Sequence, residues 1–213
     1  MRDVARTLAH LHSLGAAHKD VTLDNVLVDA QNRFRLHDFA LLELFGDGDE
    51  EAEGTAAEQS DDEADEHIDG SQLLRRRSST MSAQWSGKRE HMSPENWQCF
   101  KGQRERFDAA ANDVWGFGVV LCACFSRDAF LWHEPDQALR DAHKLSDALR
   151  EAFRISRYPQ RQQTVLRSLV DLLTNIFVDE THRICMQRVL SHPFFAEVDV
   201  EVTPNELCGC AVL

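Results

Sequence analysis

The sequence lacks an excess of basic residues, and this absence sets the first limit on its function. Its 213 residues include 23 Lys and Arg against 36 Asp and Glu, which gives a formal net charge of −13. A nucleic-acid partner is disfavoured, because no basic excess is available to displace counterions from phosphates. Thirteen of the acids lie between Glu43 and Asp69, where no Lys or Arg occurs, so the other 23 acids are balanced by the 23 bases. The acidity therefore belongs to one segment, and the rest of the chain is neutral.

Disulfide frameworks and long apolar runs are also missing. Six cysteines in 213 residues are too few for a disulfide scaffold. No apolar stretch follows Met1, which argues against a secretory signal. The longest apolar run, residues 115–125, is about half of the roughly 20 residues that a transmembrane helix needs. These absences predict a soluble, cytoplasmic protein with reduced cysteines.

Apolar periodicity indicates a mainly helical chain. Apolar side chains recur every three or four residues over residues 4–14, which predicts a helix with Gly15 as its C-terminal cap. Two short runs, residues 26–28 and 34–39, are separated by a turn and predict a β-hairpin. Four more helices are predicted: one capped by Asn112 or Asp113, one through Ala138, Leu145 and Leu149, one over residues 166–176, and one over residues 186–190 that stops near Pro193.

The string HKDVTLDN, residues 18–25, carries the main chemical signal. Asn25 lies five positions after Asp20, and Asp38 lies at the end of the second predicted strand. Phosphoryl transfer needs a carboxylate that accepts the proton of the attacking hydroxyl. It also needs an amide oxygen and a second carboxylate to hold Mg²⁺ on the phosphates, and Mg²⁺ favours such hard oxygen ligands. The hairpin brings Asn25 and Asp38 to one edge.

This pattern resembles the catalytic loop and the metal-binding Asp of protein kinases. The resemblance implies that Asp20 is the catalytic base, and that Asn25 and Asp38 bind Mg²⁺ and, through it, ATP. Three later strings match the family in order: residues 87–95 (GKREHMSPE, the substrate-site strand, with Ser93 in place of Ala), residues 113–118 (DVWGFG, the central helix) and residues 190–195 (LSHPFF, the end of the domain).

The resemblance also assigns structural roles. Arg183 sits where the family's Arg pairs with the glutamate of the Pro-Glu string, so we expect a Glu95–Arg183 ion pair. His18, in the His-x-Asp pattern, and Asp113, at the start of the central helix, complete this set. Two departures accompany these matches, since Lys19 replaces an Arg, and Ala40 replaces the Gly that follows Asp-Phe.

The implied fold is mainly α: a protein-kinase-like C-terminal lobe with a small β-hairpin. The resemblance covers residues 1–45 and 84–196. Only 17 residues precede the catalytic loop, so we expect the N-terminal lobe to be missing from this chain. Residues 46–83 are predicted to be an acidic, disordered insert in the activation segment, ending in an Arg/Ser cluster, and residues 197–213 a flexible tail.

The implied function is ATP-dependent phosphorylation of protein serine or threonine, and the lobe alone is expected to be inactive. The alternative is a membrane-tethered pseudokinase scaffold that binds partner proteins through its helical surface. A Gly-rich loop and a Val-Ala-x-Lys segment in frame upstream of Met1 would favour the enzyme, and their absence would favour the scaffold.

Two further departures lie near Asp20. Serine/threonine-specific members have a Lys two residues after the catalytic Asp, where this chain has Thr22, and a Thr after the Gly of the substrate strand, where it has Lys88. One interpretation is a swap, in which Lys88 supplies the ammonium and Thr22 the hydroxyl beside Asp20. The other interpretation is that both positions have lost their roles.

The acidic insert and its basic end permit several interpretations. The insert either occupies a basic substrate groove, or pairs with the arginines at 75–77, or is a tolerated loop with a small closure cost. The same arginines precede Ser78, Ser79 and Thr80, which makes these hydroxyls candidates for phosphorylation.

The last four residues, from Cys210 to Leu213, fit a prenylation signal of the geranylgeranyl type. Cys208 is a candidate for a second acyl chain, because stable anchoring needs two signals. Lipidation predicts contact with the cytoplasmic face of a membrane, and the alternative is a coincidental tail.

Overall fold

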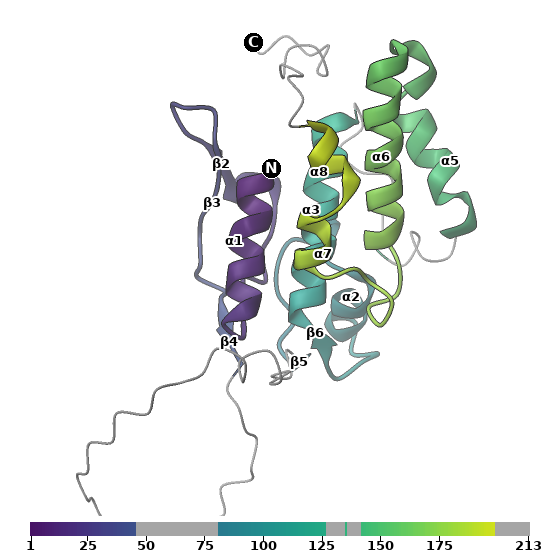
Figure 1. Ribbon diagram of the computed structural model, residues 1–213. Helices are drawn as coiled ribbons and strands as arrows, with labels where there is room; N and C mark the ends of the chain where they lie inside the picture. Colours follow the sequence, from purple (N-terminus) through teal and green to yellow (C-terminus); the bar gives the residue numbers. More distant parts are fainter. Residues whose placement is uncertain (46–80, 127–134, 136–141, 199–213) are drawn as a thin grey trace, which may run out of the picture.

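Helices carry most of the chain in the computed structural model, which describes residues 1–45, 81–126, 135 and 142–198 (Figure 1). The helices are α1 (Arg2–Ser13), α2 (Pro94–Phe100), α3 (Ala109–Phe125), α5 (Ala142–Ala152), α6 (Gln160–Ile176), α7 (Met186–Leu190) and α8 (Pro193–Val198). The strands are β1 (Ala16–Ala17), β2 (Val26–Val28), β3 (Phe34–Leu36), β4 (Glu43–Leu44), β5 (Met81–Ser82) and β6 (Phe107–Asp108). The prediction of a mainly helical unit with a small hairpin is therefore confirmed.

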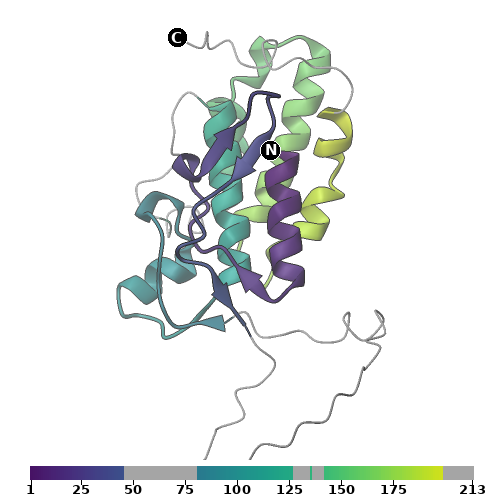
Figure 2. The ribbon, with the colours of Figure 1, turned by 90° about the vertical axis from the view of Figure 1, so that its left-hand side faces the viewer.

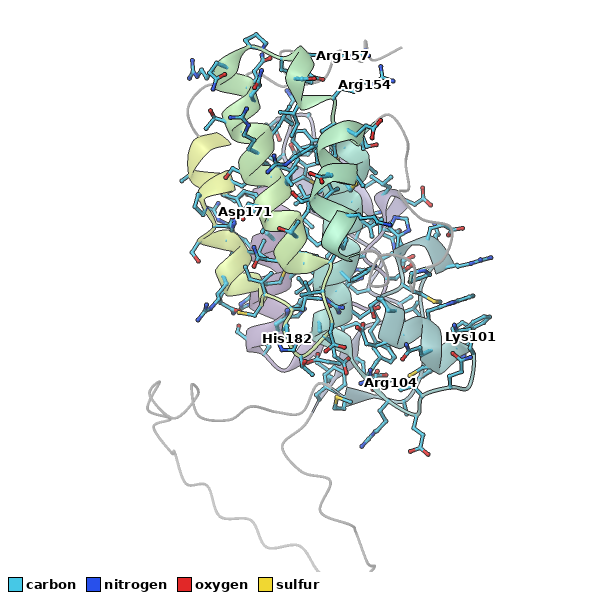
Figure 3. The ribbon with its side chains drawn as sticks, turned by 90° about the vertical axis from the view of Figure 1, so that its right-hand side faces the viewer. Lys101, Arg104, Arg154, Arg157, Asp171 and His182 are labelled. Atoms are coloured by element: carbon cyan, nitrogen blue, oxygen red, sulfur yellow. The ribbon has the colours of Figure 1, made fainter. Side chains whose placement is uncertain are left out.

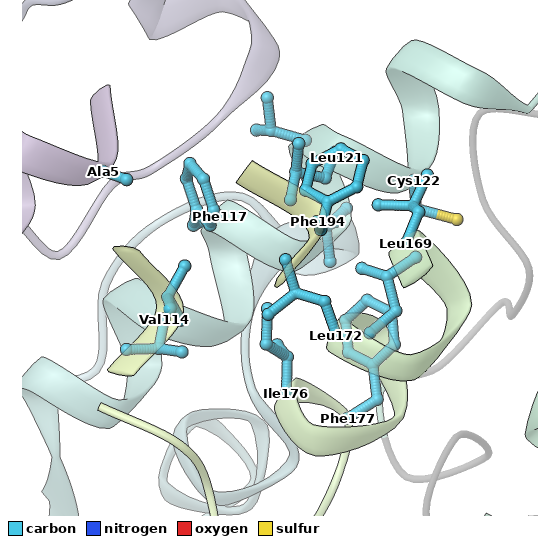
Figure 4. Close-up of a cluster of buried hydrophobic side chains, with 14 of the residues drawn as sticks. Ala5, Val114, Phe117, Leu121, Cys122, Leu169, Leu172, Ile176, Phe177 and Phe194 are labelled. Carbon is cyan, nitrogen blue, oxygen red and sulfur yellow. The ribbon is translucent and has the colours of Figure 1, made fainter. Parts of the chain in front are cut away.

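Helix α3 forms the centre of the fold. Thirteen of its residues are buried, and α1 and α6 pack on different sides of it (Figures 1 and 2). The close-up in Figure 4 shows Phe117 and Leu121 of α3 beside Leu172 and Ile176 of α6, with Phe194 of α8 against them. Each such fully buried side chain contributes roughly 1.5–3 kcal/mol through apolar burial.

Helix α1 follows the predicted pattern closely. Val4, Ala5 and Leu8 are fully buried, and the helix packs against α7 and β3. It ends at Ser13, and Gly15 follows with φ 68°, the left-handed conformation expected at a C-terminal cap. The helix therefore delivers the chain directly into residues 16–25.

Three antiparallel strand pairs lie beside the helices (Figure 2). β2 and β3 form the predicted hairpin, with Val26 opposite Leu36, although β3 ends three residues earlier than predicted. β1 pairs with β4, and β5 pairs with β6. The predicted insert also ends too late at residue 83, because Met81 and Ser82 already form β5.

Two helix boundaries differ from the prediction. α3 begins at Ala109, and its cap is Asp108, whose carboxylate accepts the Ala111 N–H (3.0 Å), rather than Asn112 or Asp113. Pro193 starts α8 instead of only stopping α7, because proline fits the first turn of a helix, where no N–H is needed. The helix α2 was not predicted, since the string resembled a strand.

Several predictions fall outside the described residues. They concern the insert over residues 46–80, with Ser78, Ser79 and Thr80, Ala138, and the tail beyond residue 198, with Cys208 and Cys210. Within the described part of the chain, every helix is too short or too polar to cross a bilayer.

Candidate active site

A buried carboxylate holds the loop of residues 18–25 against α3. Asp113 is fully buried, and its two oxygens accept the backbone N–H groups of His18 and Lys19, both at 2.7 Å. His12, near the end of α1, lies 3.0 Å from the same carboxylate through Nε2. Sequence reasoning missed His12, because only the fold brings it to Asp113. The start of the loop is therefore fixed by hydrogen bonds to a charged group, which are the stronger kind.

Close packing continues this attachment. A Cβ atom on Gly116 of α3 would lie 2.7 Å from the carbonyl oxygen of Val21. Only glycine lets the helix approach the loop backbone this closely. The DVWGFG string thus combines an acid that binds the loop with a glycine that admits it.

Lys19 links the loop to two distant strands. Its φ is 68°, and its ammonium donates to Glu43 of β4 (2.6 Å) and to Ser82 of β5 (3.2 Å). Ser82 Oγ donates to the same Glu43 oxygen (2.8 Å). Partial burial by itself raises the pKa of Glu43, but the hydrogen bonds from Lys19 and Ser82 outweigh it, and the pKa is lowered. The departure from Arg to Lys therefore leaves a cation with an internal carboxylate partner.

Asp20 and Asn25 form one hydrogen-bonded unit. Asn25 Nδ2 donates to the Asp20 carbonyl oxygen and to Asp20 Oδ2, both at 2.8 Å. The other carboxylate oxygen, Asp20 Oδ1, is buried and has no hydrogen-bond partner among the described residues. One oxygen is thus fixed while the other remains able to accept a proton.

His18 joins this unit to the segment that carries Asp38. The Asp20 N–H donates to His18 Nδ1 (3.3 Å), which leaves the ring proton on Nε2 to donate to the His37 carbonyl (3.1 Å). The His18 ring also packs edge-on against Phe39, with 5.0 Å between centroids. The His37 N–H donates to the Asn25 carbonyl (3.0 Å), so Asp38 follows directly after a residue paired with Asn25.

Asn25 and Asp38 fit a magnesium ion by donor chemistry. Asn25 uses its NH₂ group for both bonds to Asp20, which leaves its amide oxygen for another partner. Asp38 is exposed, adopts φ 62°, and accepts a 3.3 Å bond from the Ala40 N–H. Mg²⁺ is usually held by one or two protein oxygens plus waters and phosphates. No cluster of three His, Cys, Asp or Glu side chains in the described ranges offers another metal site.

A small, partly open hollow lies beside Asp20. It is lined by Gly87, Lys88 and His91 of the substrate-site string and by Gly116 of α3. Its enclosed space is about that of one water molecule, so it admits a hydroxyl group and is too small for a bound small molecule. Burial lowers the pKa of His91, so this residue is neutral at pH 7.

Lys88 and Thr22 lie at the site without completing the predicted swap. The Lys88 ammonium pairs with Asp24, which raises the pKa of Lys88 and lowers that of Asp24. Asp20 adds a smaller attraction that also raises the pKa of Lys88. Thr22 Oγ1 is buried and has no hydrogen-bond partner in the described part of the chain. The swap therefore stays a prediction.

The expected ion pair between Glu95 and Arg183 is confirmed. Arg183 Nη2 donates to both Glu95 oxygens, at 3.0 and 3.1 Å, and the two side chains are 0% and 3% exposed. The other guanidinium nitrogens donate to the carbonyls of Ile176 (3.0 Å) and Ala111 (3.1 Å). The guanidinium also stacks over Trp115 at 4.9 Å. This pair binds the start of α2 to α3 and α6.

The outer edge of α2 carries basic side chains. Figure 3 shows Lys101 and Arg104 on this edge, and Arg104 pairs with Glu180. Arg89 and Lys101 lie over the Trp97 ring at 5.1 and 5.6 Å. Because Arg89 follows Lys88, this cationic and aromatic edge adjoins the hollow.

Comparison with known proteins gives one family. The family described as "Protein kinase domain" matches residues 1–195. The chain is 31% identical over 118 residues to CBL-interacting protein kinase 22 of Oryza sativa subsp. japonica, covering 55% of this chain and 20% of that protein. It is 23% identical to mitogen-activated protein kinase kinase 7 of Arabidopsis thaliana and 22% identical to the phosphorylase b kinase gamma catalytic chain, liver/testis isoform, of Bos taurus. Each of these two matches covers 92% of this chain, but 52% and 39% of the relative. The chain thus spans from a fifth to about half of the length of these relatives.

Proposed function

Because this chain belongs to the protein kinase family, we propose that it is the C-terminal lobe of a protein serine/threonine kinase. In this lobe Asp20 accepts the proton of the substrate hydroxyl, and Asn25 and Asp38 hold the Mg²⁺ of ATP. Bound Mg²⁺ neutralises charge on the phosphates during transfer. The protein substrate presents its hydroxyl to the hollow beside Asp20.

One observation carries this proposal: the state of the Asp20 carboxylate. Asn25 holds Oδ2, while Oδ1 is buried and without a partner among the described residues, beside the hollow. A general base must be held in place and keep one oxygen ready for the proton. The attachment of the preceding residues to Asp113 supplies the rigid support.

Lys88 and Thr22 belong to the same proposal. The Lys88–Asp24 pair is exposed, and such hydrated pairs exchange partners at little cost. We propose that Lys88 moves from Asp24 to Asp20 and Thr22 when a substrate hydroxyl and ATP are bound. The neighbouring Gly87 already lies against Asp20.

The lobe alone is proposed to be inactive, because nothing in the described residues covers a nucleotide. Apolar side chains at the hairpin and after Asp38 are exposed: Leu27 (53%), Val28 (58%), Phe39 (45%) and Leu41 (42%). This surface supports a covering ATP-binding lobe in the enzyme. It equally favours the second candidate function, a pseudokinase scaffold that binds a partner protein there.

The test measures Mg²⁺·ATP binding and phosphate transfer. The chain alone and the longest product of its gene are assayed by thermal shift and by transfer of the γ-phosphate to Ser- and Thr-containing peptides. We expect transfer by the longest product, its loss in Asp20→Asn and Asp38→Asn, and no change in the exposed control Asp147→Asn. A longest product that neither shifts with Mg²⁺·ATP nor transfers phosphate would establish the scaffold instead.

We also propose two modifications outside the described residues. Prenylation of Cys210, with acylation of Cys208, would hold the protein at the cytoplasmic face of a membrane, and Cys210→Ser is expected to release it. Phosphorylation at Ser78, Ser79 or Thr80 is checked by phosphopeptide mapping. A wild-type protein found only in the soluble fraction would refute the anchor.

A further inference from the structure

Beside the candidate active site, the side chain of a buried asparagine makes the hydrogen bonds that a neighbouring strand would make to the backbone of Ser86. Asn96 of α2 is fully buried, and its Nδ2 donates to the Ser86 carbonyl oxygen (2.8 Å). The Ser86 N–H donates back to Asn96 Oδ1 (3.4 Å). A side-chain amide can satisfy both backbone groups of one residue in this way, as a neighbouring strand would. Asn96 therefore fixes the backbone of Ser86 in two directions.

Helix α3 holds this asparagine in place. Asn112 Oδ1 accepts Asn96 Nδ2 (3.1 Å) and the Ser93 N–H (3.0 Å). Asn112 is 4% exposed and Ser93 is fully buried. A buried polar network in which every group has a partner favours one arrangement. If one partner is displaced, the remaining polar groups are left without a hydrogen bond, because no water reaches them. Through Asn96 and Asn112, the position of Ser86 is thus tied to α3, the helix with the most buried residues.

Ser86 reaches the residue before the proposed base. Its Oγ donates to the Lys19 carbonyl oxygen (3.3 Å), which belongs to the peptide unit of Asp20. Lys19 has φ 68°, a conformation that a non-glycine residue keeps only when its surroundings enforce it. Asp113 binds the Lys19 N–H, and Ser86 binds its carbonyl oxygen. The peptide units before and after this strained residue are therefore each held by a hydrogen bond from another part of the chain.

The residue after Ser86 packs directly on the base. A Cβ atom on Gly87 would lie 3.1 Å from the Lys19 carbonyl oxygen and 3.5 Å from Asp20 Oδ1. A side chain here would press on the Lys19 carbonyl oxygen, and the φ of 93° also favours glycine. A shift of Ser86 must therefore move Gly87 and Lys88 relative to Asp20.

We propose that Asn96 is a positioning residue. It acts through Ser86 and fixes the segment that begins at Gly87 relative to the peptide unit between Lys19 and Asp20. The role of Asp20 rests on the proposed function, but the positioning itself does not. Asn96 touches neither substrate nor metal in this scheme.

Hydrogen exchange of backbone amides tests the positioning directly. Asn96→Ala is compared with Asn175→Ala, an exposed asparagine of α6 whose side chain donates to Asp171. We expect Asn96→Ala to speed exchange over residues 84–92 by about tenfold or more, since buried backbone groups lose their partner, with exchange in α6 changed less than about twofold. Equal acceleration in α6 would show a merely structural role, and exchange at the control's rate would overturn the proposal.

A second variant covers the case in which Asn96→Ala does not fold. Ser86→Ala removes only the hydroxyl that holds the Lys19 carbonyl, and Ser191→Ala, at an exposed serine, is its control. Ser86→Ala is expected to speed exchange at residues 19–21 but not in α6. An unchanged rate at residues 19–21 would contradict the link.

The transfer assay separates this proposal from the proposed function. If the longest gene product transfers phosphate, Asn96→Ala is expected to lower kcat about tenfold while the KM for ATP stays within about twofold. An unchanged kcat would overturn the positioning role even with altered exchange. If the wild type transfers nothing, the proposed function fails, and the exchange experiments alone decide the positioning.

Discussion

Two ion pairs hold the segment from Gly87 to Glu95, and they lie in opposite environments. The Glu95–Arg183 pair is buried, with side chains 3% and 0% exposed, whereas Asp24 and Lys88 are 75% and 46% exposed. Breaking a buried pair leaves an isolated charge without water, but breaking an exposed pair returns both charges to solvent. The Glu95 side chain is thus fixed, whereas the Lys88 side chain beside Asp20 remains adjustable.

Removing the buried arginine should have the largest effect. Arg183→Met leaves the Glu95 carboxylate buried without its partner, so we expect a loss of about 3–5 kcal/mol in the free energy of unfolding. Urea denaturation measures it. The double variant Arg183→Met/Glu95→Leu should recover much of this loss, because no lone charge remains. A loss below about 1 kcal/mol for the single variant would remove the contrast between the two pairs.

Replacing Asp113, a buried acid whose main partners are backbone N–H groups, should have the second largest effect on stability. Asp113→Asn keeps one acceptor oxygen and replaces the other by an NH₂ donor, so one of the bonds from the His18 and Lys19 N–H groups is lost. We expect a loss of about 1.5–3 kcal/mol, the contribution of a hydrogen bond to a charged group. Denaturation and amide exchange at residues 18 and 19 measure it. A value equal to that of Asp147→Asn would show that burial of the acid is not what matters.

The ion pair of the half-buried Glu43 lies between these two extremes of burial, and its contribution to stability should depend on pH. Its pKa lies below the ordinary 4.5, because the hydrogen bonds from Lys19 and Ser82 outweigh partial burial. Below pH 4.5 the unfolded chain therefore binds more protons than the folded chain, and the stabilisation that is complete above 4.5 is lost as the pH falls. Glu43→Gln should flatten the curve of unfolding free energy in this acid range. Parallel curves for the two proteins would contradict the assignment.

The exposed pair should have the smallest effect on stability. Lys88→Met and Asp24→Asn are expected to leave the urea midpoint within error, because water replaces the lost contact. Any small difference should vanish in high salt, which screens exposed charges. A clear destabilisation that persists in salt would mean that the Lys88 side chain is also fixed.

The fold could be predicted where amphipathic patterns are long. α1 and α6 bury one apolar face each, and the hairpin has its own turn, so local sequence determines them. α2 is seven residues long and carries buried polar residues, which hides its pattern. β5 and β6 are two residues each and form only because distant segments meet.

The site divides in the same way. Asp20, Asn25 and Asp38 were recognisable because their spacing along the chain is itself the signal. Ser86, Asn96 and the partnership of Lys19 with Glu43 were not, since they depend on contacts that only the fold creates.

The burial of Lys19 allows opening of the catalytic loop to be followed by chemical labelling of lysines. The chain has only four lysines, and Lys88, Lys101 and Lys144 are exposed, whereas the Lys19 side chain is 4% exposed. An amine-reactive reagent should label those three at once and Lys19 only when its contacts with Glu43 and Ser82 open. The delay, read by mass spectrometry on single peptides, would time the opening of the loop next to Asp20 without any added probe.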